Sequence, residues 1–185
     1  MLHGRLVTLR EIRRSDLAVI HRELRSDVVT TSLGETAPWR PVSLARLEAD
    51  FDRRLTEPEP QHVGFAVQQR GDGPGELVGS CSLWQIDEHN GTAHIGLQLV
   101  ASVRGRGLST DVVRVLCHYA FVVRNLHRVG IETLASNQPM RKAAMRAGFV
   151  EEGVVREAAY VLGERVDEVT YGLLRSEWRP DGDRS

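Results

Sequence analysis

The sequence has no excess of charge of either sign, and this absence argues against one class of function. Its 185 residues include 24 Lys and Arg against 25 Asp and Glu, which gives a formal net charge of -1. Lys142 is the only lysine among the basic residues. A chain without a basic surplus lacks the electrostatic attraction that drives nucleic-acid binding. We therefore expect no nucleic-acid partner.

Cysteine and long apolar runs are scarce as well. The two cysteines, Cys81 and Cys117, lie far apart and lack metal-ligand spacing, so we expect reduced core thiols and no metal site. No apolar run is long enough to cross a bilayer. The segment Met1–Arg5 does not have the pattern of a secretory leader. We expect a cytoplasmic protein without a membrane partner.

The remaining composition is typical of one globular domain. Hydrophobic residues make up 41% of the chain and charged residues 26%. A chain of this length suits a single domain with a full core. We expect that domain over residues 1–178, followed by a polar tail over residues 179–185.

Apolar periodicity predicts alternating strands and helices. Strands are expected at residues 6–11, 63–69, 77–86, 92–100, 128–134, 149–155 and 166–174. Helices are expected after Ser15–Asp16, after Ser43, from Ser109 to about Arg124, and from Pro139 to Gly148. Residues 30–41 contain one glycine and two prolines and are expected to be mostly loop. This order predicts an α+β fold with a mixed, mostly antiparallel sheet of about seven strands and about four flanking helices.

The most informative stretch is Val103–Thr110, which links the strand at 92–100 to the helix that starts at Ser109. Gly105 and Gly107 allow a ligand to approach the backbone closely, and the first N–H groups of a helix point at an anion. The turn is neither a P-loop nor a dinucleotide-binding fingerprint, because the third glycine and a Gly-Lys-Ser/Thr sequence are missing. By itself, the stretch fits either a phosphate cradle or a plain tight turn.

Three further stretches accompany this turn. They are Asn125–Val129 at the entrance to a strand, Asn137 with its spacing to Gly148-Phe149, and Glu152–Arg156 followed by Asp167 and Glu177-Trp178. Together with Arg104–Ser109, they resemble the GNAT N-acyltransferase superfamily. The resemblance is greatest to its ribosomal-protein N-acetyltransferase-like (RimJ/RimL-like) branch, and it extends from Leu6 to Trp178. Two positions depart from the pattern: Ser109 stands where glycine or alanine is usual, and Met140 stands where serine is common.

The resemblance implies acetyl-CoA as the acyl donor and no metal. The pyrophosphate would bind the N–H groups at the start of the helix after the glycine turn. The strands at 92–100 and 128–134 splay apart in the family, and the pantetheine arm pairs with the edge near Leu99–Val100, where a backbone N–H polarises the thioester carbonyl. The residues expected to contact acetyl-CoA are Leu99, Val100, Arg104, Arg106, Gly107, Leu108, Ser109, Thr110, Asn137 and Met140.

Acetyl transfer to an amine requires a base, because free amines are mostly protonated near neutral pH. Relatives often carry a glutamate in the strand before the glycine turn, and His94 takes that place here. Histidine suits this role, and Gly96, on the same strand face, is expected to leave open space beside the ring. The alternative is that His94 is a hydrogen-bonded structural residue and that Glu88 assists through solvent.

The remaining site assignments also have two interpretations each. Tyr160 can replace the missing serine as the acid that protonates the leaving thiolate, or it can be a packed ring. Glu35 can contact the acceptor amine or be an exposed loop residue. Trp39 can line the acceptor pocket or anchor its loop.

These features predict an N-acetyltransferase that transfers an acetyl group from acetyl-CoA to a primary amine by direct attack. The acceptor can be a protein N-terminus, a small amine, or an aminated metabolite or antibiotic. The alternatives are a non-catalytic acyl-CoA-binding or sensing module and a transferase for a longer acyl donor. We expect a monomer or a homodimer.

Overall fold

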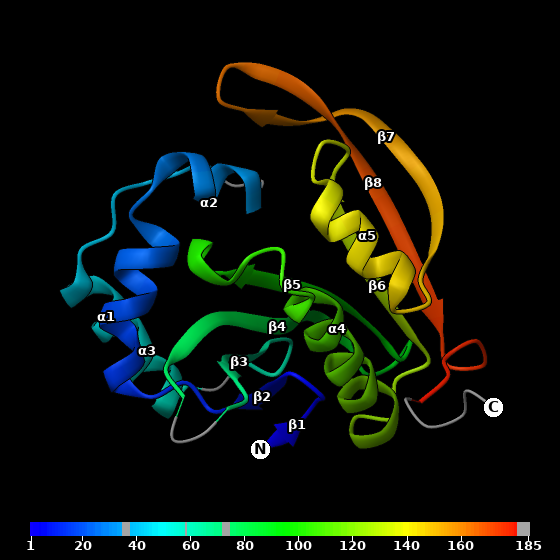
Figure 1. Cartoon of the computed structure of the whole chain (residues 1–185), viewed down its shortest axis with the longest axis horizontal. Helices are drawn as coiled ribbons and strands as arrows, with labels where there is room; N and C mark the ends of the chain where they lie inside the picture. Colours follow the sequence, from blue (N-terminus) through cyan, green and yellow to red (C-terminus); the bar gives the residue numbers. More distant parts are fainter. Residues whose placement is uncertain (35–37, 58, 72–74, 181–185) are drawn as a thin grey trace.

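A single mixed sheet organises the chain. The computed structural model describes residues 1–34, 38–57, 59–71 and 75–180. Eight strands lie in the order β1-β2-β3-β4-β5-β6-β8-β7 (Figure 1). Their bounds in that order are Leu2–His3, Val7–Arg10, Val63–Gln69, Leu77–Asp87, Thr92–Leu99, Arg128–Leu134, Glu164–Leu174 and Val150–Val161. All neighbours are antiparallel except β5 and β6, so the expected mixed, mostly antiparallel sheet is confirmed.

Helices cover both faces of this sheet (Figure 1). On one face lie α4 (Leu108–His118), which continues through a π-helical turn to Val123, and α5 (Gln138–Arg146). On the other lie α1 (Leu17–Ile20), α2 (Val28–Gly34) and α3 (Leu44–Thr56). Neighbouring positions on the strands establish this division. The centroid of the Phe65 ring on β3 lies 5.2 Å from that of Tyr119, the residue that follows α4. On the opposite face, the side chain of Gln98 on β5 points toward Gly34 of α2.

The only parallel pair in the sheet separates after three residue pairs. Thr92 pairs with Arg128, Ala93 with Val129, and His94 with Gly130. Beyond these pairs β5 continues along β4 to Leu99, while β6 continues along β8 to Leu134. The two strands therefore turn away from each other after His94 (Figure 1). The expected divergence of these strands is confirmed, and each presents an edge of backbone groups to the space between them.

Most of the predicted elements lie where the periodicity puts them, with three differences. The helix α2 occupies part of the segment that was expected to be loop, so that expectation was wrong for residues 30–34. The short strand β1 precedes the first predicted strand. The last two strands are longer than expected, since β7 extends to Val161 and β8 begins at Glu164.

Candidate active site

The turn before α4 leaves backbone N–H groups available to a ligand. Gly107 is the N-cap residue with a φ of 81°, and Gly105 has a φ of 79°. No side chain of the described residues caps the helix. A methyl group on Gly107 would meet only the Leu6 side chain, at 3.9 Å, and one on Gly105 would meet nothing within 4 Å. The first N–H groups of α4 thus face open space, which is the arrangement that binds phosphate.

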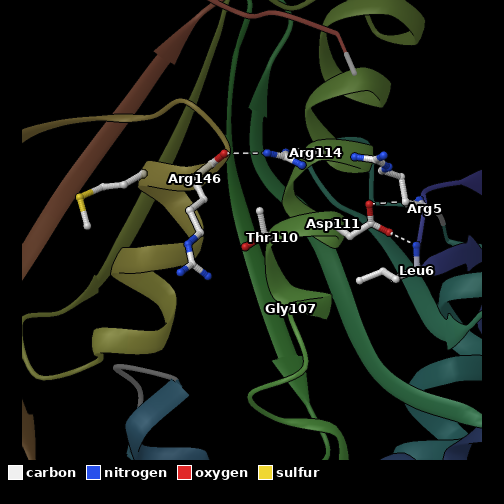
Figure 2. Close-up of a pocket in the computed structure, with 8 residues that line it drawn as sticks. Arg5, Leu6, Gly107, Thr110, Asp111, Arg114 and Arg146 are labelled. Atoms are coloured by element: carbon white, nitrogen blue, oxygen red, sulfur yellow. Dashed lines mark hydrogen bonds between the residues drawn. The ribbon is translucent and has the colours of Figure 1, made fainter. Parts of the chain in front are cut away.

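The one acidic side chain in the first turn of α4 does not face this space. Asp111 is 5% exposed, and its carboxylate accepts hydrogen bonds from the backbone N–H groups of Arg5 (3.1 Å), Leu6 (2.7 Å) and Val7 (3.0 Å). Figure 2 shows the carboxylate turned toward Arg5 and Leu6. Asp111 therefore fixes the start of α4 to the start of β2, and its negative charge is satisfied away from the cradle.

A cavity of about 780 Å³ adjoins the cradle. Its lining includes Gly107, Thr110 and the hydrogen-bonded Asp111 of the α4 start and three arginines, Arg5, Arg114 and Arg146 (Figure 2). The Nη2 atom of Arg114 donates to the Arg146 backbone carbonyl at 3.0 Å, which links α4 to the end of α5. We did not single out these three arginines from the sequence, because they come from three separate elements. The one local signal was the four-residue spacing of Thr110 and Arg114, which places both on one helix face.

The last residues of β5 determine which backbone N–H groups face the gap between β5 and β6. The Val100 N–H donates to the Val78 carbonyl of β4 at 2.9 Å, so of the two residues expected at this edge, Val100 does not direct its N–H toward the gap. Because successive residues of a strand direct their N–H groups to opposite edges, the Leu99 N–H faces the gap. The Leu99 carbonyl accepts from Arg104 Nε at 3.1 Å, so Arg104 braces the end of β5. Arg106 is exposed.

Asn137 and Met140 lie together at the start of α5. The Asn137 side-chain oxygen accepts from the Met140 N–H at 3.2 Å, so Asn137 is the N-cap residue of this helix. Asn137 therefore stabilises the start of α5, a structural role that the sequence did not indicate. Met140 is half-buried, and its side chain packs against the core. A thioether offers no proton donor at this position.

His94 stands where β5 and β6 part. Its Nδ1 atom is buried, forms no hydrogen bond within the described chain, and lies 3.5 Å from Oε1 of Glu132 on β6. The ring packs against Trp84, with centroids 5.0 Å apart, and the side chain keeps 28% exposure. The expected open space beside Gly96 was wrong, because a methyl group there would lie 3.0 Å from Ser82 Oγ and 3.6 Å from the Trp84 ring. The ring lies over Gly130 instead, where no side chain competes for the space.

The other predicted site residues are not brought to His94. Glu88 lies in the turn between β4 and β5, 77% exposed, and pairs with Arg124 at 3.0 Å. Tyr160 is 64% exposed near the β7–β8 turn, with Arg165 5.5 Å from its ring centre. Trp39 donates from Nε1 to the Arg25 carbonyl at 3.1 Å, as an anchor of its loop does. Glu35 lies outside the described residues.

Two carboxylates on the His94 face of the sheet were missed by sequence reasoning. Glu132 lies two residues after Gly130 on β6, and Glu168 lies on β8 opposite Leu134, two residue pairs beyond Glu132 and Thr170 and therefore on the same face. Burial raises the pKa of Glu168, and the negative charge of Glu132 raises it further. Within the described residues, no Arg or Lys ion pair involves either carboxylate. Within the part of the chain that the structure describes, the face beside His94 thus carries two carboxylates without an arginine or lysine ion-pair partner.

The parted strands and the uncapped helix start together define the class of protein, an acyl-CoA-dependent transferase, and the comparisons agree. Residues 6–150 match the acetyltransferase (GNAT) domain model, and the chain belongs to this family. It is thus an N-acetyltransferase, as the sequence predicted.

Three known proteins illustrate the relationship. A putative ribosomal N-acetyltransferase, YdaF of Bacillus subtilis, is 39% identical over 56% of this chain and 57% of its own length. An uncharacterised N-acetyltransferase, p20 of Bacillus licheniformis, is 28% identical over 96% of this chain and 97% of its own. The crystal structure of spermidine N-acetyltransferase from Vibrio cholerae in complex with CoA and spermine has a TM-score of 0.81. That structure is 24% identical and covers 93% of this chain and 97% of its own. The expected fold is confirmed by this likeness.

Two features are absent from the residues that the structure describes. No group of three His, Cys, Asp or Glu side chains is arranged to hold a metal ion there. In the same part of the chain, no helix has the length and apolarity needed to traverse a bilayer.

Proposed function

We propose that this chain transfers the acetyl group of acetyl-CoA to a primary amine of a small cationic acceptor, with His94 as the base. One observation carries the proposal: within the described residues, the one parallel strand pair opens directly after His94, on the strand that leads into the start of α4, which no described side chain caps. The helix start that can bind a phosphate and the strand edge that can bind an extended chain thus follow His94, a titratable side chain, on the same segment.

The described residues fit CoA. The backbone N–H groups of Leu108, Ser109 and Thr110 would hold the pyrophosphate, with the positive end of the α4 dipole favouring its charge. The cavity with Arg5, Arg114 and Arg146 would take the remaining phosphate and the nucleoside. The edge of β5 at Leu99 would pair with the pantetheine amides, as an added strand does. Acetyl-CoA supplies the activated acetyl group.

His94 accounts for the proton. An acceptor amine carries a positive charge near neutral pH and cannot attack until it loses a proton. In the proposed step, the imidazole takes that proton, a C–N bond forms at the acetyl carbon, and the C–S bond breaks. The attacking nitrogen loses its second proton when it becomes the amide nitrogen; the departing CoA thiolate takes up this proton and leaves as the thiol, and the first proton passes from His94 to solvent. Because Met140 cannot donate a proton, the reaction relies on no acid at that position.

The acidic face beside His94 favours a cationic acceptor. Glu132 and Glu168 have no arginine or lysine partner within the described chain, and a second ammonium group of the acceptor would supply that charge. An acceptor with two or more ammonium groups is a diamine or a polyamine. The relative from Vibrio cholerae is a spermidine N-acetyltransferase by name. The free, buried thiols of Cys81 and Cys117 fit the expected cytoplasmic setting.

A thiol-release assay with a panel of acceptors tests the proposal. The panel contains polyamines, matched monoamines of the same chain length, and peptides with free N-termini, each with acetyl-CoA and with a longer acyl-CoA. We expect the fastest release with acetyl-CoA and a polyamine. Binding of CoA by calorimetry without release from any pair would instead support an acyl-CoA-binding module.

A further inference from the structure

We propose that Glu132 is the positioning residue of His94: it accepts a hydrogen bond from Nδ1–H and so leaves the lone pair on Nε2 to take the acceptor proton. The inference rests on the proposed function, since it assigns a partner to the proposed base. The pair links β6 to β5 at the point where they part.

The geometry holds the ring so that Nδ1 faces β6. A methyl group on Gly130 would lie 3.0 Å from Nδ1 and 3.1 Å from Cε1, so the imidazole lies against the Gly130 backbone. Trp84 packs against the ring from β4. Glu132 is on the same face of β6 as Gly130, two residues further on. The position of Nδ1 relative to Glu132 is therefore set by backbone register and by packing.

The burial of Nδ1 and its distance from the Glu132 carboxylate favour one tautomer of the imidazole. Nδ1 is buried without a hydrogen bond in the described structure, and leaving such an atom unpaired costs about 1–3 kcal/mol. Glu132 Oε1 is 3.5 Å away, and the proposed hydrogen bond requires the Glu132 side chain to rotate until this distance reaches the usual 2.7–3.2 Å of an N–H···O bond. An ionised carboxylate only accepts hydrogen bonds, so the pairing selects the Nδ1–H tautomer of neutral histidine.

The charged groups around the ring are consistent with this role. From β4 the ring meets Trp84, which carries no charge. From β6 it meets Glu132, while Arg128 on the same strand is already paired with Glu152 of β7. From β8 the nearest acidic group on this face is Glu168, which interacts with Glu132. Glu132 is thus the only charged side chain of the described residues within ion-pair distance of His94.

The test compares Glu132→Gln with wild type by two readouts. ¹⁵N NMR of histidine-labelled protein, with His94→Gln to assign the signal, reports which ring nitrogen carries the proton. Steady-state kinetics at saturating acceptor reports kcat. Glu164→Gln is the matched control, because Glu164 is an exposed carboxylate at the start of β8, away from His94.

We expect neutral His94 to carry its proton on Nδ1 in wild type and in Glu164→Gln, and to become a mixture of both tautomers in Glu132→Gln, because a glutamine amide can either accept from or donate to Nδ1. We expect kcat of Glu132→Gln to fall about 10- to 100-fold, with KM for acetyl-CoA changed less than about 2-fold. Glu132→Asp should recover part of the rate.

An Nε2–H tautomer in wild type, or a kcat of Glu132→Gln equal to that of wild type, overturns the assignment of Glu132 even if the enzyme is active. The proposed function fails differently. In that case no acceptor releases thiol from wild type, whatever the NMR result shows for Glu132.

Discussion

The His94 ring occupies the space that a side chain at position 130 would fill. A methyl group on Gly130 would stand 3.0 Å from Nδ1 of His94, closer than ordinary van der Waals contact. The two residues form the last pair of the parallel strands, so the glycine sets the position of the imidazole at the opening of the gap.

Gly130→Ala should therefore impair catalysis more than folding. The added methyl displaces the ring by a few tenths of an ångström and changes the geometry of its contact with Glu132. We therefore expect kcat to fall at least about 10-fold. Gly153→Ala is the control, because its methyl would meet only Thr170 Oγ1, at an ordinary 3.6 Å. Equal activity of the two variants in thiol release would show that the ring position is not critical.

Gly107→Glu should abolish acetyl-CoA binding while the fold survives. The substitution puts a carboxylate where the pyrophosphate is proposed to bind, and it also strains a backbone with a φ of 81°. Gly163→Glu separates the two effects, since Gly163 has a φ of 99°, has nothing within 4 Å, and lies in the β7–β8 turn. Calorimetry should find CoA affinity lost in the first variant and kept in the second. Unchanged affinity in a folded Gly107→Glu variant would remove this turn from the site.

Met140→Leu should retain most of the turnover. The substitution roughly conserves volume at a half-buried, core-packed position, and it removes no proton donor. Steady-state rates within about 5-fold of wild type are expected. A loss above about 100-fold, which corresponds to about 2.7 kcal/mol of barrier, without loss of CoA binding would contradict the idea that no acid acts here.

Asp111→Asn should lower stability. The buried carboxylate accepts three backbone N–H groups, whereas an asparagine keeps one oxygen and turns an NH₂ group toward donors. Hydrogen bonds to charged groups contribute about 1.5–3 kcal/mol each, so we expect the free energy of unfolding in urea to fall by at least about 2 kcal/mol. Asp50→Asn, which removes one half-exposed ion pair with Arg46 on α3, should change it by less than about 1 kcal/mol. Equal effects of both substitutions would mean that Asp111 does not fix the start of α4.

The sheet and the cradle were predictable because their signals are local. The strand Val63–Gln69 follows from its apolar run and the flanking turns, and the start of α4 follows from Gly105 and Gly107. The helix α2 was hidden by its β-branched residues Val28–Thr31, which have low helix propensity. Its first turn is stabilised by Asp27, whose carboxylate accepts from the Thr30 N–H at 2.6 Å.

The surroundings of the base could not be predicted in the same way. Glu132 is a single acidic residue on a strand, and only the register of β5 on β6 brings it to His94. The space at Gly96 depends on Trp84 and Ser82 of β4, whose side chains fill it. The hydrogen bond of the Val100 N–H depends on the β4 backbone. Each of these facts arises from strand pairing and not from local sequence.

The pH dependence of kcat/KM tests the central claim, that His94 is the base, most directly. For wild type we predict that kcat/KM rises with pH through an ionisation that depends on His94. His94→Gln should lose that inflection and about 10²–10⁴ in rate, with a smaller loss at high pH, where the acceptor is already neutral. An inflection that persists in His94→Gln would contradict the account and assign the proton to another group or to water.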